Sequence, residues 1–228
     1  SLLMAIADKT VFWGYRNHGS DPTTVPDANN TAWAATGSGG SASGGNWVIT
    51  DQVLSATPAI TSGTIYTILK YNSAPSENEV LLKLDNGSKK VEVKAGADAT
   101  SLKVVGATTQ TFTDLDLTNE YTQIRLLIDS SGNAECYIHD IIEDDDGANA
   151  YKSVAGASGS TDKAQWGNTS GSIQWCNVLF TNEGNYDPEE LAPSPFVTDV
   201  LFRTGLDIVQ RLKDSSRLFL KNFIDDSS

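Results

Sequence analysis

The clearest candidate metal ligands lie in an acidic run. Residues 143–149 read Glu-Asp-Asp-Asp-Gly-Ala-Asn. Calcium takes about six to eight oxygen ligands from carboxylates, amides and backbone carbonyls, so such a loop could supply several. The run lacks the ligand alternation of the helix–loop–helix calcium site, so a solvated acidic turn is the alternative interpretation. The candidate ligands for a calcium cofactor are Asp144, Asp145, Asp146 and Asn149.

Five tryptophans raise the question of sugar binding. The apolar face of a pyranose stacks on an aromatic ring, while nearby polar groups bind the hydroxyls. Trp166 is followed two residues later by Asn168 and could form a carbohydrate site beside the acidic run. The competing interpretation is a core position, which is usual for aromatic residues in β-proteins.

The two histidines, His18 and His139, belong to no recognisable catalytic group. Neither has a Ser or Cys in a nucleophile-elbow motif, and they do not have metal-ligand spacing. His139 alternates with Tyr137 and Glu135, which is typical of a half-exposed strand. We therefore predict no catalytic residue.

Length and charge favour one large β-domain and exclude some partners. A chain of 228 residues with 19 glycines suits a sandwich with a full core. The formal charge of −13 argues against binding nucleic acid or an anionic membrane surface, because both would repel the protein. No apolar run approaches the ~18 residues of a membrane span. Residues 2–7 lack the length and basic flank of a secretion signal, so we expect no export by the general secretory route.

Short runs of β-forming residues recur at the spacing of a sandwich. Asn86-Gly87 predicts a hairpin turn, and the alternation over residues 89–94 predicts a sheet with one face in water. Residues 37–45, rich in Gly and Ser, predict a surface loop or linker. Cys136 and Cys176 are interpreted as buried free thiols, with a disulfide as the alternative. The other predicted strands span residues 9–16, 32–35, 47–54, 64–71, 79–84, 102–105, 109–115, 121–128, 134–142 and 166–180.

Residues 120–191 resemble the second half of a laminin-G-like, concanavalin-A-like jelly roll. The features that carry the resemblance are Tyr121, Tyr137, Gly167-Asn168, residues 173–180, Asn182 and Pro188-Glu189-Glu190. The family's usual Asp-Gly after the Tyr strand is missing, because Ile141 follows Asp140. The resemblance implies an all-β, two-sheet antiparallel jelly-roll sandwich over residues 1–191. That scaffold serves lectins, glycosidases, adhesion modules and virus coats, including phage virion surface proteins.

Glycosidases of this scaffold place two glutamates and an aspartate on one strand. Their two catalytic carboxyls stand about 5–5.5 Å apart in a retaining mechanism. Here Asp114 and Asp116 would share a strand face, but Glu120 falls beyond a turn. We interpret the three as solvated carboxylates and expect no enzyme.

Residues 192–228 differ in character from the preceding chain. The Pro-containing stretch 192–195 predicts a linker, and apolar residues at spacings of three and four predict an amphipathic helical tail. This surface must be buried, either on the same sandwich or on another subunit. The candidate partner-docking residues are Phe196, Val200, Leu201, Ile208, Leu212, Phe219 and Phe223.

Two functions follow from these observations. The first is a non-enzymatic structural protein of a virion, either a head decoration or a tail or fibre component. Such a protein would dock through its terminal segments to other virion subunits or to copies of itself. The second is a carbohydrate-binding lectin or adhesin module, extracellular or on a cell surface, with calcium as its candidate cofactor. The two are compatible, since a virion surface sandwich can bind a host-surface glycan.

Overall fold

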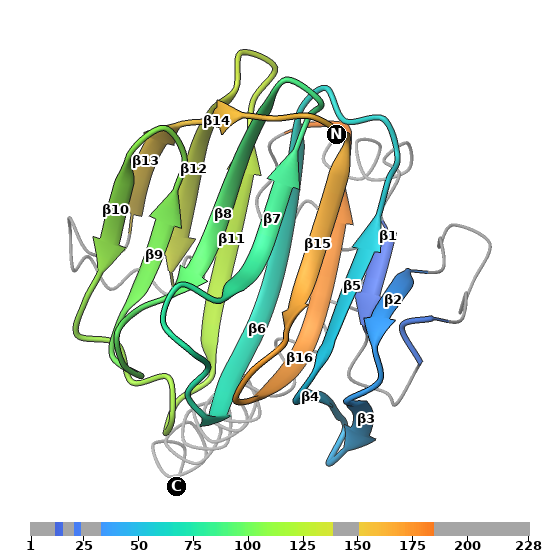
Figure 1. The fold of residues 1–228 in the computed structure, drawn as a ribbon, viewed down its shortest axis with the longest axis vertical. Coiled ribbons are helices and arrows are strands. Elements are labelled where there is room, and N and C mark those ends of the chain that lie inside the picture. Colours follow the sequence, from blue (N-terminus) through green and yellow to red (C-terminus); the bar gives the residue numbers. More distant parts are fainter. Residues whose placement is uncertain (1–11, 16–20, 24–32, 139–150, 185–228) are drawn as a thin grey trace, which may run out of the picture. The chain divides into compact units, whose positions relative to one another are not determined.

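The computed structural model describes residues 12–15, 21–23, 33–138 and 151–184, and its regular elements in these ranges are all β-strands. The strands form two antiparallel sheets of eight strands each (Figure 1). This confirms the predicted all-β, two-sheet sandwich. In the ranges given, no helix has the length and apolar character needed to span a membrane.

Sheet A contains the longest strands. Its order is β13-β12-β11-β6-β16-β4-β3, and β1 also pairs with β16. The strands are β1 (Phe12–Tyr15), β3 (Gly40–Ser43), β4 (Asn46–Ile49), β6 (Gly63–Ser73), β11 (Thr122–Ile128), β12 (Asn133–Ile138), β13 (Tyr151–Ala155) and β16 (Ser172–Thr181).

Sheet B forms the second layer. Its order is β10-β9-β8-β7-β15-β5-β2, and the short β14 pairs with β8. The strands are β2 (Ala34–Gly37), β5 (Gln52–Ala56), β7 (Val80–Asp85), β8 (Lys89–Ala95), β9 (Leu102–Val105), β10 (Thr109–Phe112), β14 (Ala157–Ser158) and β15 (Lys163–Asn168).

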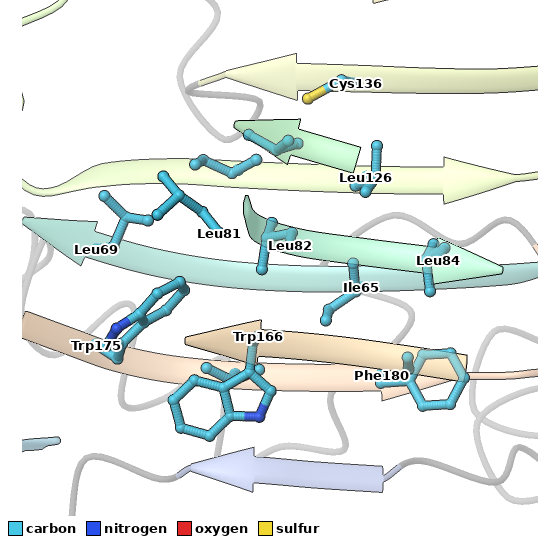
Figure 2. Close-up of a cluster of buried hydrophobic side chains, with 14 of the residues drawn as sticks. Ile65, Leu69, Leu81, Leu82, Leu84, Leu126, Cys136, Trp166, Trp175 and Phe180 are labelled. Atoms are coloured by element: carbon cyan, nitrogen blue, oxygen red, sulfur yellow. The ribbon is translucent and has the colours of Figure 1, made fainter. Parts of the chain in front are cut away.

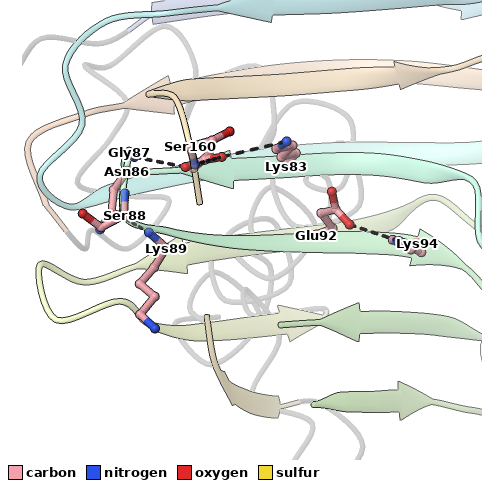
Figure 3. Close-up of polar contacts among 9 residues, drawn as sticks. Lys83, Asn86, Gly87, Ser88, Lys89, Glu92, Lys94 and Ser160 are labelled. Atoms are coloured by element: carbon pink, nitrogen blue, oxygen red, sulfur yellow. Dashed lines mark hydrogen bonds and ion pairs between the residues drawn. The ribbon is translucent and has the colours of Figure 1, made fainter. Parts of the chain in front are cut away.

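The β7–β8 hairpin turns at the predicted Asn-Gly pair. Gly87 has φ of 80°, a conformation that glycine adopts without a Cβ clash. The Asn86 Oδ1 atom accepts a hydrogen bond from the Lys89 backbone N–H at 2.8 Å. The Asp85 carboxylate accepts from the backbone N–H groups of Gly87, at 3.0 Å, and Ser160, at 3.3 Å (Figure 3). Local chemistry therefore fixes the register of this hairpin.

The alternation along β8 separates core from solvent as predicted. Val91 and Val93 are buried, whereas Glu92 and Lys94 are half-buried on the other side of the strand. Lys94 and Glu92 form an ion pair of 3.0 Å on that outer side (Figure 3). Sheet B thus has one apolar face and one polar face.

Side chains from both sheets share one core (Figure 2). Trp166 of sheet B and Trp175 of sheet A meet with ring centroids 5.4 Å apart. Fully buried aromatic and aliphatic side chains contribute the main apolar area that stabilises the sandwich. Core members shown in Figure 2 are Ile65, Leu69, Leu81, Leu82, Leu84, Leu126, Cys136, Trp166, Trp175 and Phe180.

Two predicted strands are each divided between the sheets, so those predictions are wrong. Residues 47–54 contain the end of β4 and the start of β5. Between them, the Thr50 backbone N–H donates to Gly39 O at 2.8 Å, so the chain turns here. Residues 166–180 contain the end of β15 and nearly all of β16. Gly171, with φ of 69°, lies in the turn that separates them.

The predicted loop at residues 37–45 contains a short strand, β3. Its residues pair with β4, from Gly40 opposite Ile49 to Ser43 opposite Asn46. Glycine and serine composition alone suggested a linker, whereas the apolar partner strand orders this segment. The helical tail and the boundary at residues 191/192 lie outside the described residues and stay predictions.

Both cysteines are free and buried, as predicted. Cys136 lies on β12 within the core, and burial raises the pKa of its thiol. A thiol that is neutral and inaccessible is not a nucleophile.

Candidate functional site

The structure contradicts the predicted sugar site at Trp166 and Asn168. Both residues are 0 % exposed. The Asn168 Nδ2 group donates to Ile49 O and Ser170 O, each at 3.0 Å, while its Oδ1 atom accepts from Trp175 Nε1 at 3.2 Å. Trp166 packs against Trp33 and Trp175 in the core. A solvent-borne sugar cannot reach either side chain, so their role is structural.

Three sets of candidate residues lie outside the described residues. They are the calcium ligands at residues 144–149, the two histidines, and the docking residues from Phe196 to Phe223. Within the part of the chain that the structure describes, no three His, Cys, Asp or Glu side chains are grouped to share a metal ion.

The carboxylates Asp114, Asp116 and Glu120 lie in the connection between β10 and β11, and all three are exposed. Asp114 has φ of 61°, so strand geometry has already ended there and no shared strand face exists. The Asp116 carboxylate accepts hydrogen bonds from Asn119 Nδ2 at 3.0 Å, which lowers the pKa of Asp116. These groups stabilise a turn, in agreement with their interpretation as solvated carboxylates.

A polar surface covers one end of the face of sheet A that points away from the core, called the outer face here. Core residues on β11 alternate with outward residues, so Tyr121, Gln123 and Arg125 share this face. The same alternation on β6 turns Lys70 outward. On β16 it turns Gln174 outward. The strands β11, β6, β16 and β4 are consecutive neighbours in the sheet, so these side chains gather from distant parts of the sequence.

Hydrogen bonds join four of the outward side chains, which we call the Tyr121 network: Asn46, Asn72, Tyr121 and Gln174. The Tyr121 hydroxyl donates to Gln174 Oε1 at 2.8 Å and accepts from Asn46 Nδ2 at 2.7 Å. Asn46 Nδ2 also donates to Gln174 Oε1 at 2.9 Å. Gln174 Nε2 in turn donates to Asn72 Oδ1. The network therefore ties Tyr121 to three other strands of the sheet.

The network fixes the ring of Tyr121 while leaving the ring accessible. Tyr121 precedes β11, yet its hydroxyl reaches side chains of β16 and β4, so the ring extends across β6. The Lys70 Nζ atom lies 5.6 Å from the ring centroid. Tyr121 is still 42 % exposed. A tyrosine anchored at its hydroxyl and open to solvent loses little conformational entropy when a ligand stacks on it.

Two buried amide oxygens of the outer face lack a hydrogen-bond donor. They are Asn46 Oδ1 and Gln123 Oε1, on side chains whose residues are 4 % and 6 % exposed. Buried polar atoms in proteins are nearly always paired, and an exception calls for a functional or structural reason. Both atoms are closed to solvent, so a sugar at the surface cannot reach them. The hydrogen-bonding groups open to a ligand beside Tyr121 are those of the exposed Asn72 and the half-buried Lys70.

A second polar cluster lies farther along the outer face, on β11, β12 and β13. The Arg125 guanidinium stacks on Tyr137 at 4.1 Å from the ring centroid. Glu135 accepts from the hydroxyls of Tyr137, at 2.9 Å, and Tyr151, at 3.2 Å. Burial, followed by the hydrogen bond to Glu135, raises the pKa of Tyr137. Glu135 therefore satisfies the hydroxyl groups of both tyrosines in this cluster.

Sequence reasoning missed the Tyr121 network. Tyr121 was singled out as a feature of the fold, whereas Asn46, Asn72 and Gln174 carried no signal. Asn46 and Gln174 are 128 positions apart and meet only because β4 pairs with β16. Strand alternation could have placed Tyr121 and Gln123 on one face, but not the strand order that completes the site.

No family model matches the sequence. A search of proteins with curated descriptions also found no match. Solved structures do resemble the chain. A Trypanosoma rangeli sialidase aligns with a TM-score of 0.55 at 10 % identity, over 81 % of this chain and 32 % of the sialidase. The receptor binding domain of botulinum neurotoxin mosaic serotype C/D aligns with a TM-score of 0.54 at 8 % identity, over 81 % of this chain and 50 % of that domain.

The binding domain of botulinum neurotoxin serotype D gives a TM-score of 0.52 at 7 % identity, over 82 % of this chain and 51 % of that domain. This chain therefore spans about half of each neurotoxin domain. At these identities the similarity shows the fold alone. The fold is a jelly-roll β-sandwich, consistent with the concanavalin-A-like architecture expected from the sequence.

Proposed function

We propose that the protein is a non-enzymatic carbohydrate-binding module whose binding site is the Tyr121 network with Gln123 and Lys70. The observation that carries the proposal is an exposed tyrosine ring, held by its own hydroxyl, with the exposed amide of Asn72 in the same network and the Lys70 ammonium group beside the ring. A pyranose offers an apolar face for the ring and several hydroxyls for the Asn72 amide. The similarity of the fold to a sialidase and to toxin binding domains is compatible with this role.

Binding rather than catalysis suits the chemistry of the site. The side chains of Asn46, Asn72, Gln123 and Gln174 are amides, which do not change their protonation state near neutral pH. General acid–base catalysis needs a group that titrates near the working pH. The site instead provides a stacking surface and hydrogen-bonding groups of fixed direction, which bind a sugar without activating a water molecule.

The test is a glycan array followed by affinity measurements on variants. Tyr121→Ala removes the stacking surface, and we expect the Kd to rise at least about tenfold, which is ~1.4 kcal/mol. Tyr121→Phe keeps the ring but breaks the network, so its loss should be smaller. Tyr151→Ala is the matched control, because Tyr151 is 39 % exposed on β13 of the same sheet. Equal affinities for Tyr121→Ala and the native protein would refute the proposal.

We also propose that the module works on a virion surface, docked to other virion subunits or to its own copies, with an extracellular or cell-surface location as the alternative. The support is the apolar periodicity of residues 196–224, a surface that must be buried either on the same sandwich or on another subunit. Calcium binding by residues 144–149 stays a prediction. Light scattering tests the docking: the full chain should associate and a chain ending at Ala192 should be monomeric, whereas two monomers would contradict it.

A further inference from the structure

We propose that the Tyr121 site selects an acidic glycan, meaning one whose sugar carries a carboxylate or a sulfate. This inference rests on the proposed function and specifies its ligand. Its basis is the position of Lys70, whose ammonium group stands beside the exposed Tyr121 ring on the outer face of sheet A.

The charge of sheet A is opposite in sign to that of the whole chain. The strands of sheet A turn two cationic residues, Lys70 and Arg125, and one acidic residue, Glu135, to the outer face. Lys152 of β13 shares the side of the core residue Val154, and its ammonium group lies over the Phe112 ring of sheet B. The complete protein has a formal charge of −13. A strongly acidic protein repels acidic polymers over most of its surface. On the outer face, the cationic group open to an anionic ligand beside Tyr121 is Lys70, because Arg125 is buried.

Lys70 is available to a ligand. Among the described residues Lys70 makes no ion pair, and its ammonium group makes a cation–π contact with the Tyr121 ring. Glu135 pairs with Leu127 of β11, which in turn pairs with Thr64 of β6. Thr64 and Lys70 are six residues apart on β6, so Glu135 and Lys70 are about 20 Å apart along the strand direction. Glu135 is also bonded to Tyr137 and Tyr151. Glu120, in the turn before β11, is exposed to solvent, where an ion pair would be weak.

The other groups of the site also fit an anion better than a cation. Asn46, Asn72, Gln123, Gln174 and Tyr121 are all uncharged, so no carboxylate in this group repels an acidic sugar. The exposed Asn72 amide can hydrogen-bond a sugar hydroxyl, while the Lys70 ammonium donates a charge-assisted hydrogen bond to the anionic substituent. A lysine acts as a point charge, so it serves carboxylate and sulfate alike.

The experiment is an array that pairs each uronic acid, sialic acid and sulfated glycan with its neutral counterpart, a methyl ester or a desulfated form. The native protein should bind the acidic member at least about tenfold more tightly, as expected of a charge-assisted hydrogen bond. Carboxylated and sulfated members distinguish the two anions. Raising the salt concentration from about 0.05 M to about 0.5 M should reduce the preference.

Three variants complete the test. Lys70→Gln should lose the acidic preference while still binding the neutral counterparts, and Lys70→Arg should keep it. Lys163→Gln is the matched control, because Lys163 is a half-buried strand lysine of sheet B. Equal binding of acidic and neutral members, or an unchanged preference in Lys70→Gln, would overturn the inference and leave the glycan site in place. Absence of binding to every glycan would overturn the proposed function itself.

Discussion

Asn168→Ala gives the sharpest test of whether Asn168 is structural. Its buried side chain makes three hydrogen bonds, to Ile49 O, to Ser170 O and from Trp175 Nε1. Each contributes about 1 kcal/mol net, and the Trp175 N–H left unpaired in the core adds about 1–2 kcal/mol. We therefore expect the free energy of unfolding to fall by about 4–5 kcal/mol, a large share of the ~5–15 kcal/mol that stabilises a typical domain.

Urea unfolding followed by tryptophan fluorescence measures this loss. With an unchanged slope of about 2–3 kcal/mol per molar urea, the midpoint should fall by about 1.3–2.5 M. Asn133→Ala is the control: Asn133 is exposed and its side chain bonds only the Asp129 carboxylate, so its effect should stay within about 0.5 kcal/mol. Folded Asn168→Ala should bind glycan normally. A loss under ~1 kcal/mol, or lost glycan binding without destabilisation, would refute the structural assignment.

Two further predictions concern titratable groups. Burial raises the pKa of the Cys136 thiol. We therefore expect Cys136 to resist a thiol reagent at mildly alkaline pH in the folded protein and to react after denaturation. Fast labelling of Cys136 in the folded protein would contradict this. Hydrogen bonds from Thr100 lower the pKa of Asp98 in the folded protein. The ionised Asp98 therefore stabilises the fold at pH values above its unfolded pKa of about 4. This stabilisation is lost as the pH falls through the lower pKa of the folded state. Asp98→Asn should therefore flatten the decline of Tm with acid, and an unaltered decline would show that this turn does not contribute.

The sequence predicts the fold wherever local pattern decides it. Alternation along residues 89–94 and the Asn86-Gly87 turn predicted β7, β8 and their hairpin. The predictions failed at residues 47–54 and 166–180, where β-forming residues run on across a turn. At Thr50 the turn is held by Gly39 and at Thr169 by the Glu79 carboxylate, partners that no local pattern reveals.

The site was less accessible to sequence reasoning than the fold. Trp166 looked suitable for stacking on a sugar because it is aromatic and near an amide, yet its strand alternation turns it into the core. Tyr121, in contrast to Trp166, faces outward from its sheet. The amides that anchor Tyr121 come from strands that are close in the sheet but distant in the sequence. Strand order, which results from global packing, determines which residues become a surface.

A nuclear magnetic resonance titration of the native protein with an acidic oligosaccharide selected on the array tests the binding face most directly. We predict that the side-chain amide resonances of Asn46, Asn72 and Gln174 shift in proportion to occupancy, while that of Gln165 on sheet B stays in place. Shifts confined to sheet B, or binding that leaves all three amides unperturbed, would contradict a glycan site on the outer face of sheet A.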